Sequence, residues 1–102
     1  VVTTLPDVGV YIIANVNRGA VKVGMTKCGV KKRLSGLQTG SPDPLSVVGF
    51  IPTNEARDAE KKAHSLLGPR LNGEWFDETP CTAIAALLPH FPGMITSTPQ
   101  QP

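Results

Sequence analysis

The sequence predicts one small α/β domain, with elements in the order strand, strand, helix, strand, helix. Runs of β-branched and aromatic residues are separated by turn-forming residues, and later stretches carry apolar residues at helical spacing. A chain of 102 residues fits a single domain that can bury a modest core. We expect this domain to span residues 8–92, between a lead-in over 1–7 and a flexible, linker-like tail over 93–102.

The first two strands are predicted to form a hairpin. Residues 9–13 (GVYII) and 20–25 (AVKVGM) are mostly apolar, and the turn-forming segment 15–19 joins them. Tyr11 and Lys22 place polar tips inside these strands. Antiparallel pairing would allow both side chains to share one face of the sheet, although the sequence does not fix the register.

The third strand and the first helix come after this hairpin. Residues 45–51 (LSVVGFI) form the most continuous apolar run, which predicts a central strand. A short helix is predicted over 30–37, because its apolar residues recur at helical spacing. Residues 74–76 are predicted to return briefly as extended chain.

Two more helices are predicted in the second half of the chain. One is expected to begin at a cap formed by Thr53 or Asn54 and to continue to about Leu67. The last, over 81–88, opens with Thr79 and Pro80 and is rich in Ala and Leu, as is typical of a helix that covers a core.

Glu60 is the most informative residue of the second helix. It precedes Ala63 by three residues and therefore lies on the predicted buried stripe, with His64 one turn further along the same face. A carboxylate turned toward a core is costly unless it is paired or binds a cation. The spacing leaves two interpretations open: a structural ion pair with Arg33 or Lys22, or a functional carboxylate.

Composition excludes several classes of protein. The two cysteines, Cys28 and Cys81, imply neither a disulfide framework nor a zinc site, and we expect free thiols. No apolar run approaches the roughly 20 residues of a membrane span, and no signal peptide is visible. We therefore expect an intracellular protein, in cytoplasm or nucleus, without membrane contact. The chain begins without Met, which suggests a domain with flanking domains in a longer protein.

Six short fragments, taken in order, resemble the motifs of the GIY-YIG nuclease superfamily. They are GVY (9–11), KVG (22–24), KKRL (31–34), LQTGSP (37–42), EKKAH (60–64) and GEWF (73–76). The resemblance extends over roughly residues 8–76 and is strongest to the phage-T5-type branch, whose members are described as DNA-binding or nuclease domains. The resemblance implies a small, mostly antiparallel three-stranded sheet flanked by helices.

The resemblance also implies a function, a divalent-metal-dependent endonuclease that hydrolyses DNA phosphodiester bonds, with RNA as an alternative partner. Glu60 matches the helix glutamate that holds a single Mg2+ or Mn2+ in this superfamily. Arg33 would grip the scissile phosphate, and Tyr11 would contact or deprotonate the attacking water. His64 would shuttle a proton or brace Glu60. Lys22 stands where the named motif has tyrosine, and would orient the water or stabilise phosphate charge.

The net charge of +2 is small, but the segment 22–33 contains five basic residues and no acid. Such a run is either a solvated helix face or the approach of a DNA backbone, and the resemblance favours the second for Lys27, Lys31 and Lys32. Glu74 is expected to pair with a nearby base. Trp75 is expected to anchor the core rather than to stack on nucleobases.

Two alternative functions share the same residues. One is a catalytically inactive module of the same fold that binds DNA or another polyanion. The other is a protein-interaction domain in which Glu60 and Arg33 form only a buried ion pair. The presence of the whole set that the resemblance assigns to catalysis favours the nuclease, and a carboxylate on an apolar stripe argues against a degraded binding module.

Overall fold

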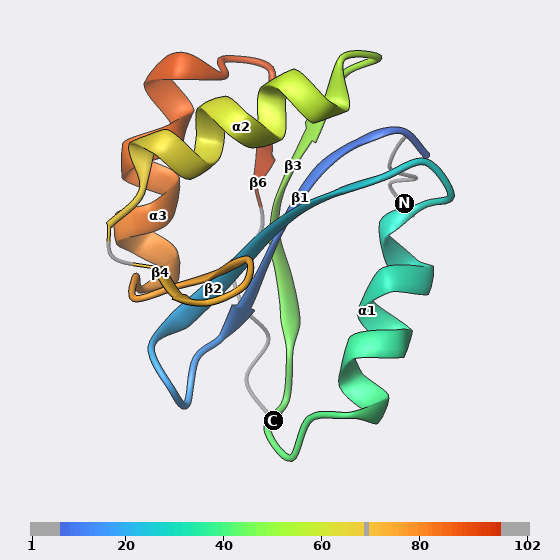
Figure 1. The fold of residues 1–102 in the computed structure, drawn as a ribbon, viewed down its shortest axis with the longest axis vertical. Helices are drawn as coiled ribbons and strands as arrows, with labels where there is room; N and C mark the ends of the chain where they lie inside the picture. The colour runs from blue at the N-terminus through green and yellow to red at the C-terminus, as the bar shows by residue number, and fades with distance from the viewer. Residues whose placement is uncertain (1–6, 69, 97–102) are drawn as a thin grey trace.

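The computed structural model describes residues 7–68 and 70–96, which form a six-stranded sheet and three α-helices (Figure 1). The strands are β1 (Gly9–Asn15), β2 (Ala20–Thr26), β3 (Ser46–Pro52), β4 (Arg70–Asn72), β5 (Trp75–Phe76) and β6 (Ile95–Thr96). The helices are α1 (Val30–Thr39), α2 (Ala56–Leu66) and α3 (Pro80–Leu87), the last followed by a 3-10 turn over Leu88–His90. The predicted α/β class is confirmed.

The sheet has the order β4-β5-β2-β1-β3-β6, and neighbouring strands pair antiparallel throughout. The predicted count of three strands is too low, because three strands of two or three residues extend the two edges. β3 is also not central as predicted: the long strand with long partners on both sides is β1. The continuous apolar run of β3 reflects helices on both faces of the sheet rather than a central place within it.

The hairpin of β1 and β2 brings Tyr11 and Lys22 to the same face. Tyr11 pairs with Gly24 and Ile13 pairs with Lys22, so the two polar side chains lie diagonally across the strand pair. Gly19 closes the turn with a φ of 63°, a conformation that glycine adopts without strain. The hairpin predicted from the sequence is therefore confirmed, as is the shared face.

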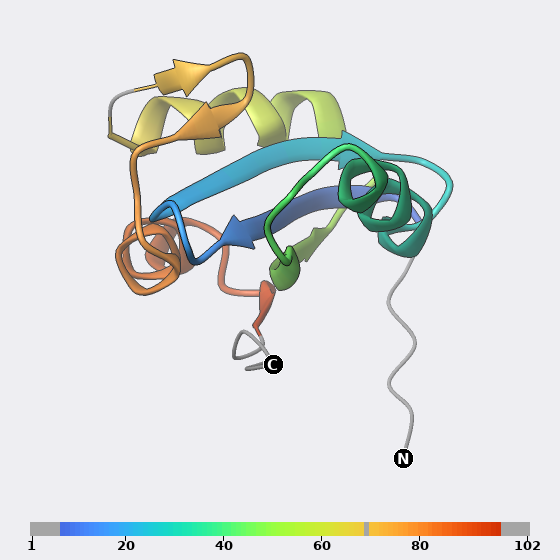
Figure 2. The ribbon, with the colours of Figure 1, turned by 90° about the horizontal axis from the view of Figure 1, so that it is seen from below.

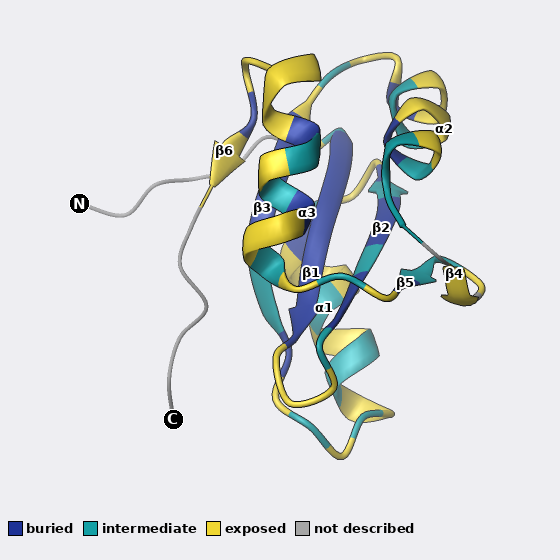
Figure 3. Ribbon diagram, turned by 90° about the vertical axis from the view of Figure 1, so that its left-hand side faces the viewer, coloured by how far each residue is buried: buried dark blue, intermediate teal, exposed yellow. Residues whose placement is uncertain are grey.

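The helices cover both faces of the sheet (Figures 1 and 2). α2 and α3 lie on one face and α1 on the other. β1 supplies alternate side chains to the two cores, Val10 and Ile12 toward α2 and α3, and Tyr11 and Ile13 toward α1. β1 is buried along its whole length, as the dark strand at the centre of Figure 3 shows. The sheet is thus a layer between helices, and β1, the strand that carries Tyr11, lies at its centre.

The helix ends differ slightly from prediction. α1 continues to Thr39, two residues further than predicted. α2 begins after Glu55, which caps it without a side-chain hydrogen bond, so the predicted cap at Thr53 or Asn54 is wrong. The Thr53 hydroxyl instead accepts the Glu55 N–H at 3.0 Å, just before the helix. For α3, the cap at Thr79 is confirmed, because its hydroxyl accepts the amide three residues on.

The end of the described chain packs on the domain. Met94 is buried in the core beside α3, and β6 pairs with β3, within the segment where the sequence predicts a tail from residue 93. Residues 1–6 and 97–102, most of the predicted lead-in and tail, lie outside the described residues. Cys28 and Cys81 are exposed, free thiols. Across 7–68 and 70–96, none of the helices has the length and apolar character needed to cross a membrane.

Candidate active site

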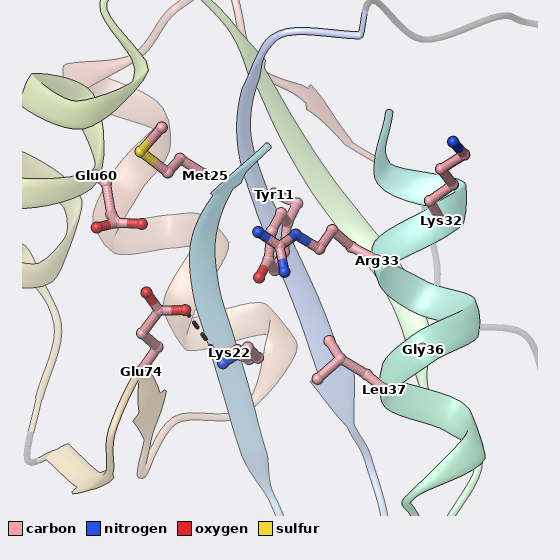
Figure 4. Close-up of a pocket in the computed structure, with 9 residues that line it drawn as sticks. All are labelled: Tyr11, Lys22, Met25, Lys32, Arg33, Gly36, Leu37, Glu60 and Glu74. Atoms are coloured by element: carbon pink, nitrogen blue, oxygen red, sulfur yellow. Dashed lines mark ion pairs between the residues drawn. The ribbon is translucent and has the colours of Figure 1, made fainter. Parts of the chain in front are cut away.

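A cavity of about 380 Å³ collects four of the five predicted catalytic residues (Figure 4). Tyr11 comes from β1, Lys22 from β2, Arg33 from α1 and Glu60 from α2. The four elements are scattered along the sequence, yet their polar side chains line one hollow. Glu74, which the sequence predicts only as a partner for a base, lines the same cavity and adds a second carboxylate to it.

Gly24 makes the close approach of two of these side chains possible. It lies opposite Tyr11 in the hairpin, and the Tyr11 hydroxyl and the Glu74 carboxylate both occupy the space above its Cα. A Cβ at this position would overlap both groups, so no other residue fits without moving one of them. The glycine of the KVG fragment is therefore part of the site, a role that its place in the motif could have suggested.

Lys22 and Glu74 form an ion pair, with Nζ 3.1 Å from Oε1. The Lys22 side chain is only 16% exposed, so its ammonium is partly withdrawn from water. β5 makes the pair possible, because Trp75 is the partner of Lys22 in the sheet and Glu74 immediately precedes it. The prediction that Glu74 pairs with a nearby base is confirmed, and the base is Lys22.

Glu60 reaches the cavity past an open stretch of the β2 edge. β5 pairs only with Val21 and Lys22, which leaves the end of β2 without a neighbouring strand on that side among the described residues. Figure 4 shows the Glu60 carboxylate extending from α2 toward β2, on the side of that strand where Glu74 lies. Its Oε2 is buried and has no hydrogen-bond partner among the described residues. A buried carboxylate oxygen without a partner is unfavourable on its own.

The structural ion pair that the sequence left open is not formed. Lys22 pairs with Glu74 instead of Glu60. Arg33 is exposed and makes no ion pair with any residue of the described ranges, although it lines the same cavity. Within the described chain, Glu60 and Arg33 thus face one hollow as unpaired charges, an arrangement that is ready for ligands of both signs.

The Tyr11 hydroxyl has a raised pKa. Burial is the main cause, and the negative charges of Glu74 and Glu60 add to it, while Arg33 acts in the opposite direction. The phenol is therefore neutral at physiological pH and can donate a hydrogen bond. Because Glu74, Arg33 and Glu60 all affect the pKa of Tyr11, these three charges lie within electrostatic range of its hydroxyl.

The predicted DNA-contacting lysines lie at different distances from this site. Lys32 lines the cavity from α1, and Lys31, beside it on the helix, is exposed. Lys27 is exposed in the connection before α1 and lines a separate hollow near the start of α2. Helix α1 therefore places the positive charges of Lys31 and Lys32 beside Arg33, whereas Lys27 lies apart from this group.

His64 lies outside the cavity and is held by two neighbours. Its Nε2 is 2.8 Å from the Val23 carbonyl oxygen, and its Nδ1 is 3.3 Å from Nη2 of Arg70. A carbonyl can only accept and a guanidinium can only donate, so Nε2 carries the proton and Nδ1 accepts. The ring also packs on Phe76, with centroids 5.1 Å apart. These contacts fix α2 against the edge of β2 rather than touching Glu60.

The donor set of the cavity fits a hard divalent cation. The buried, unpartnered Glu60 Oε2 is the kind of oxygen that Mg2+ or Mn2+ prefers, and the Glu74 carboxylate and Tyr11 hydroxyl supply further oxygens nearby. Within residues 7–68 and 70–96, no three His, Cys, Asp or Glu side chains form a ready cage. Mg2+ does not need one, because it binds through one or two carboxylates and keeps several waters.

The fold and the site together define a small α/β domain with an antiparallel sheet and a polar cavity lined from β1, β2, α1 and α2. Comparison of this chain with protein-family models, with curated proteins and with solved structures gave no match in any of the three. A function for the chain therefore has to be inferred from the geometry and chemistry of the cavity.

Proposed function

We propose that this chain is a divalent-metal-dependent endonuclease domain that hydrolyses DNA phosphodiester bonds. The observation that carries the proposal is the cavity itself. It combines a buried, unpartnered carboxylate oxygen of Glu60 with the cations of Arg33 and Lys22 and the neutral hydroxyl of Tyr11. Phosphodiester hydrolysis needs this mixture, because phosphate charge must be offset while a water attacks and an oxygen leaves.

Arg33 and Lys22 would interact with the phosphate in different ways. Arg33 is exposed and unpaired in the described chain, and its planar fork of donors can bind two phosphate oxygens at once. Lys22 is a compact, largely buried charge in the lining of the cavity and can stabilise negative charge that develops on the phosphate. The raised pKa of Tyr11 favours a neutral phenol that orients the attacking water by a hydrogen bond over one that removes its proton.

Glu60 is the residue that would hold Mg2+ or Mn2+. A bound divalent cation supplies Lewis-acid stabilisation of charge on the phosphate and makes a coordinated water more acidic. Glu60 needs no rearrangement of an existing ion pair for this, because its inner oxygen has no partner in the described chain.

A plasmid-nicking assay tests the proposal. Supercoiled DNA is incubated with wild type, Glu60→Ala and Arg33→Ala in Mg2+, in Mn2+ and in EDTA, with Arg57→Ala as the control. Arg57 is an exposed arginine of α2 that lies outside the cavity. We expect metal-dependent nicking that falls about 100- to 1,000-fold in both site variants and is unchanged in Arg57→Ala. Nicking that survives Glu60→Ala would refute the assignment of the site.

The Lys22–Glu74 ion pair favours a second candidate, a DNA- or polyanion-binding module that does not cut. In this form Glu74 neutralises the lysine that catalysis would need, and binding would depend on Arg33 and the lysines of α1. Salt-sensitive DNA binding by wild type, weakened by Arg33→Ala and without nicking in either metal, would decide for this module.

A further inference from the structure

We propose that a groove beside the candidate active site binds one unpaired nucleotide of the substrate and stacks its base on Trp75. The proposal rests on the proposed function and specifies the substrate. A second cavity, of about 460 Å³, adjoins the first along α1, and Gly36 and Leu37 line both. A phosphate held by Arg33 would therefore place a neighbouring nucleoside at the mouth of this groove.

The groove has the chemistry of a stacking site. Its lining is largely apolar and includes the rings or aliphatic chains of Trp75, Leu37, Leu45 and Leu71. Leu71 is 57% exposed, so much of its side chain is available on the groove. Trp75 packs against the core under α1, as the sequence predicts for an anchor, but it is only partly buried and also lines the groove, which leaves it available for the stacking that the sequence analysis did not favour. A cationic track beside an accessible aromatic ring is the combination that proteins use to hold single-stranded nucleic acid.

The Lys22 ammonium lies close to groups of both cavities. Its ammonium lies 6.0 Å from the centre of the Trp75 ring, while its other neighbour is the Glu74 carboxylate in the first cavity. The Trp75 ring and the charges that would bind phosphate are therefore adjacent, and a single nucleotide could contact both.

The polar groups at the rim of the groove already form hydrogen bonds with one another. The Asp43 carboxylate accepts hydrogen bonds from Asn15 Nδ2 at 3.1 Å and from Arg18 Nε at 3.2 Å. The Ser41 hydroxyl donates to the Asp43 carbonyl oxygen at 3.0 Å. Few groups remain to read the edge of a base, so recognition rests on stacking and tolerates sequence. A paired base is stacked within its duplex and cannot enter, which selects for unpaired nucleotides.

The single tryptophan of the chain makes the test direct, because all tryptophan fluorescence comes from Trp75. The probes are a short single-stranded oligothymidylate and the same strand annealed to its complement, both in EDTA. Binding is followed separately by the anisotropy of a label on the DNA. We expect the single strand, and not the duplex, to quench Trp75. Trp75→Leu should weaken single-strand binding roughly 5- to 150-fold.

A second variant leaves Trp75 in place. A side chain added at Gly36 would enter open space, since no atom lies within 4 Å of a Cβ there, and Gly36 borders both cavities. We expect Gly36→Leu to reduce the quenching, while Gly36→Ala, its control for helix propensity, keeps it. These results would support the groove.

Four results would count against it. Equal quenching by duplex, or full quenching in Gly36→Leu, would overturn the nucleotide groove. Absent quenching in the presence of binding that depends on Arg33 would overturn the groove and leave the proposed function standing. Nicking and DNA binding that are both indifferent to Arg33→Ala would overturn the proposed function, and the groove with it.

Discussion

Replacing Glu60 by methionine is predicted to stabilise the metal-free domain and to abolish nicking. Methionine has a similar length and favours helix, so the packing of α2 is kept while the carboxylate is removed. In the structure, Glu60 Oε2 is buried without a partner, and no cation of the described chain pairs with the carboxylate. Its removal therefore breaks no ion pair of the described residues and ends an unfavourable burial.

The size of the gain depends on how much of the carboxylate is withdrawn from water. An unsatisfied buried polar group costs about 1–3 kcal/mol. Only one of the two Glu60 oxygens is buried without a partner, and the side chain as a whole is partly exposed, so we expect the lower end, about 1 kcal/mol. For a domain of this size, that corresponds to a rise in Tm of roughly 4–8 °C.

Thermal unfolding followed by Trp75 fluorescence measures this gain, with and without Mg2+. We expect Glu60→Met to be the more stable protein in EDTA. Mg2+ should stabilise only wild type, by about 2.7 kcal/mol at a concentration one hundred times its dissociation constant.

Glu78→Met is the matched contrast. The Glu78 carboxylate accepts the Gly68 N–H at 2.7 Å, so its loss leaves a donor unsatisfied and should destabilise the domain by about 1–3 kcal/mol. If Glu60→Met lowered the Tm as Glu78→Met does, Glu60 would be a structural carboxylate and our reasoning about the site would be refuted.

Four further predictions address the rest of the site. Glu74→Gln should lower the raised pKa of Tyr11, the only tyrosine, as measured by the absorbance of tyrosinate. Because the fold favours neutral Tyr11, its contribution to stability should be complete below pH about 10 and be lost at higher pH, in alkaline denaturation curves. Gly24→Ala should reduce both nicking and Tm, since the new Cβ overlaps Tyr11 and Glu74; unchanged values would show that the cavity adapts. Replacing Lys31 and Lys32 by serine should make the dependence of log affinity on log salt shallower by up to about 2, and an unchanged slope would remove α1 from the DNA path.

The parts of the site that were predictable depend on local periodicity. Side chains of a strand alternate between faces, so a hairpin was enough to bring Tyr11 and Lys22 together. The helical repeat likewise placed Glu60 on the inner face of α2, where one of its oxygens is buried. Each of these inferences needs only the identity of the element and the residue's place within it.

The unpredicted parts depend on contacts between distant segments. Glu74 reaches Lys22 only because two residues of β5 pair with β2, and a strand of two residues has almost no signal of its own. The central position assigned to β3 was wrong for a similar reason: an apolar run reports burial on two faces and does not report strand order. The groove beside Trp75 lies between elements and could not be located from any single one.

The shortness of β5 is what opens the site, and His64 compensates for it. A longer β5 would continue along β2 past Lys22 and would cover the edge beside which Glu60 enters the cavity. Ending it early exposes the Val23 carbonyl oxygen on that edge, and His64 Nε2 donates to this oxygen at 2.8 Å. Because His64 lies one turn after Glu60 on α2, the same hydrogen bond fixes the height at which the carboxylate enters the cavity. The end of β2 beyond β5, the His64 ring that hydrogen-bonds to it and the Glu60 carboxylate beside it thus depend on one another. This gives His64 a positioning role without any contact between its ring and the reacting groups.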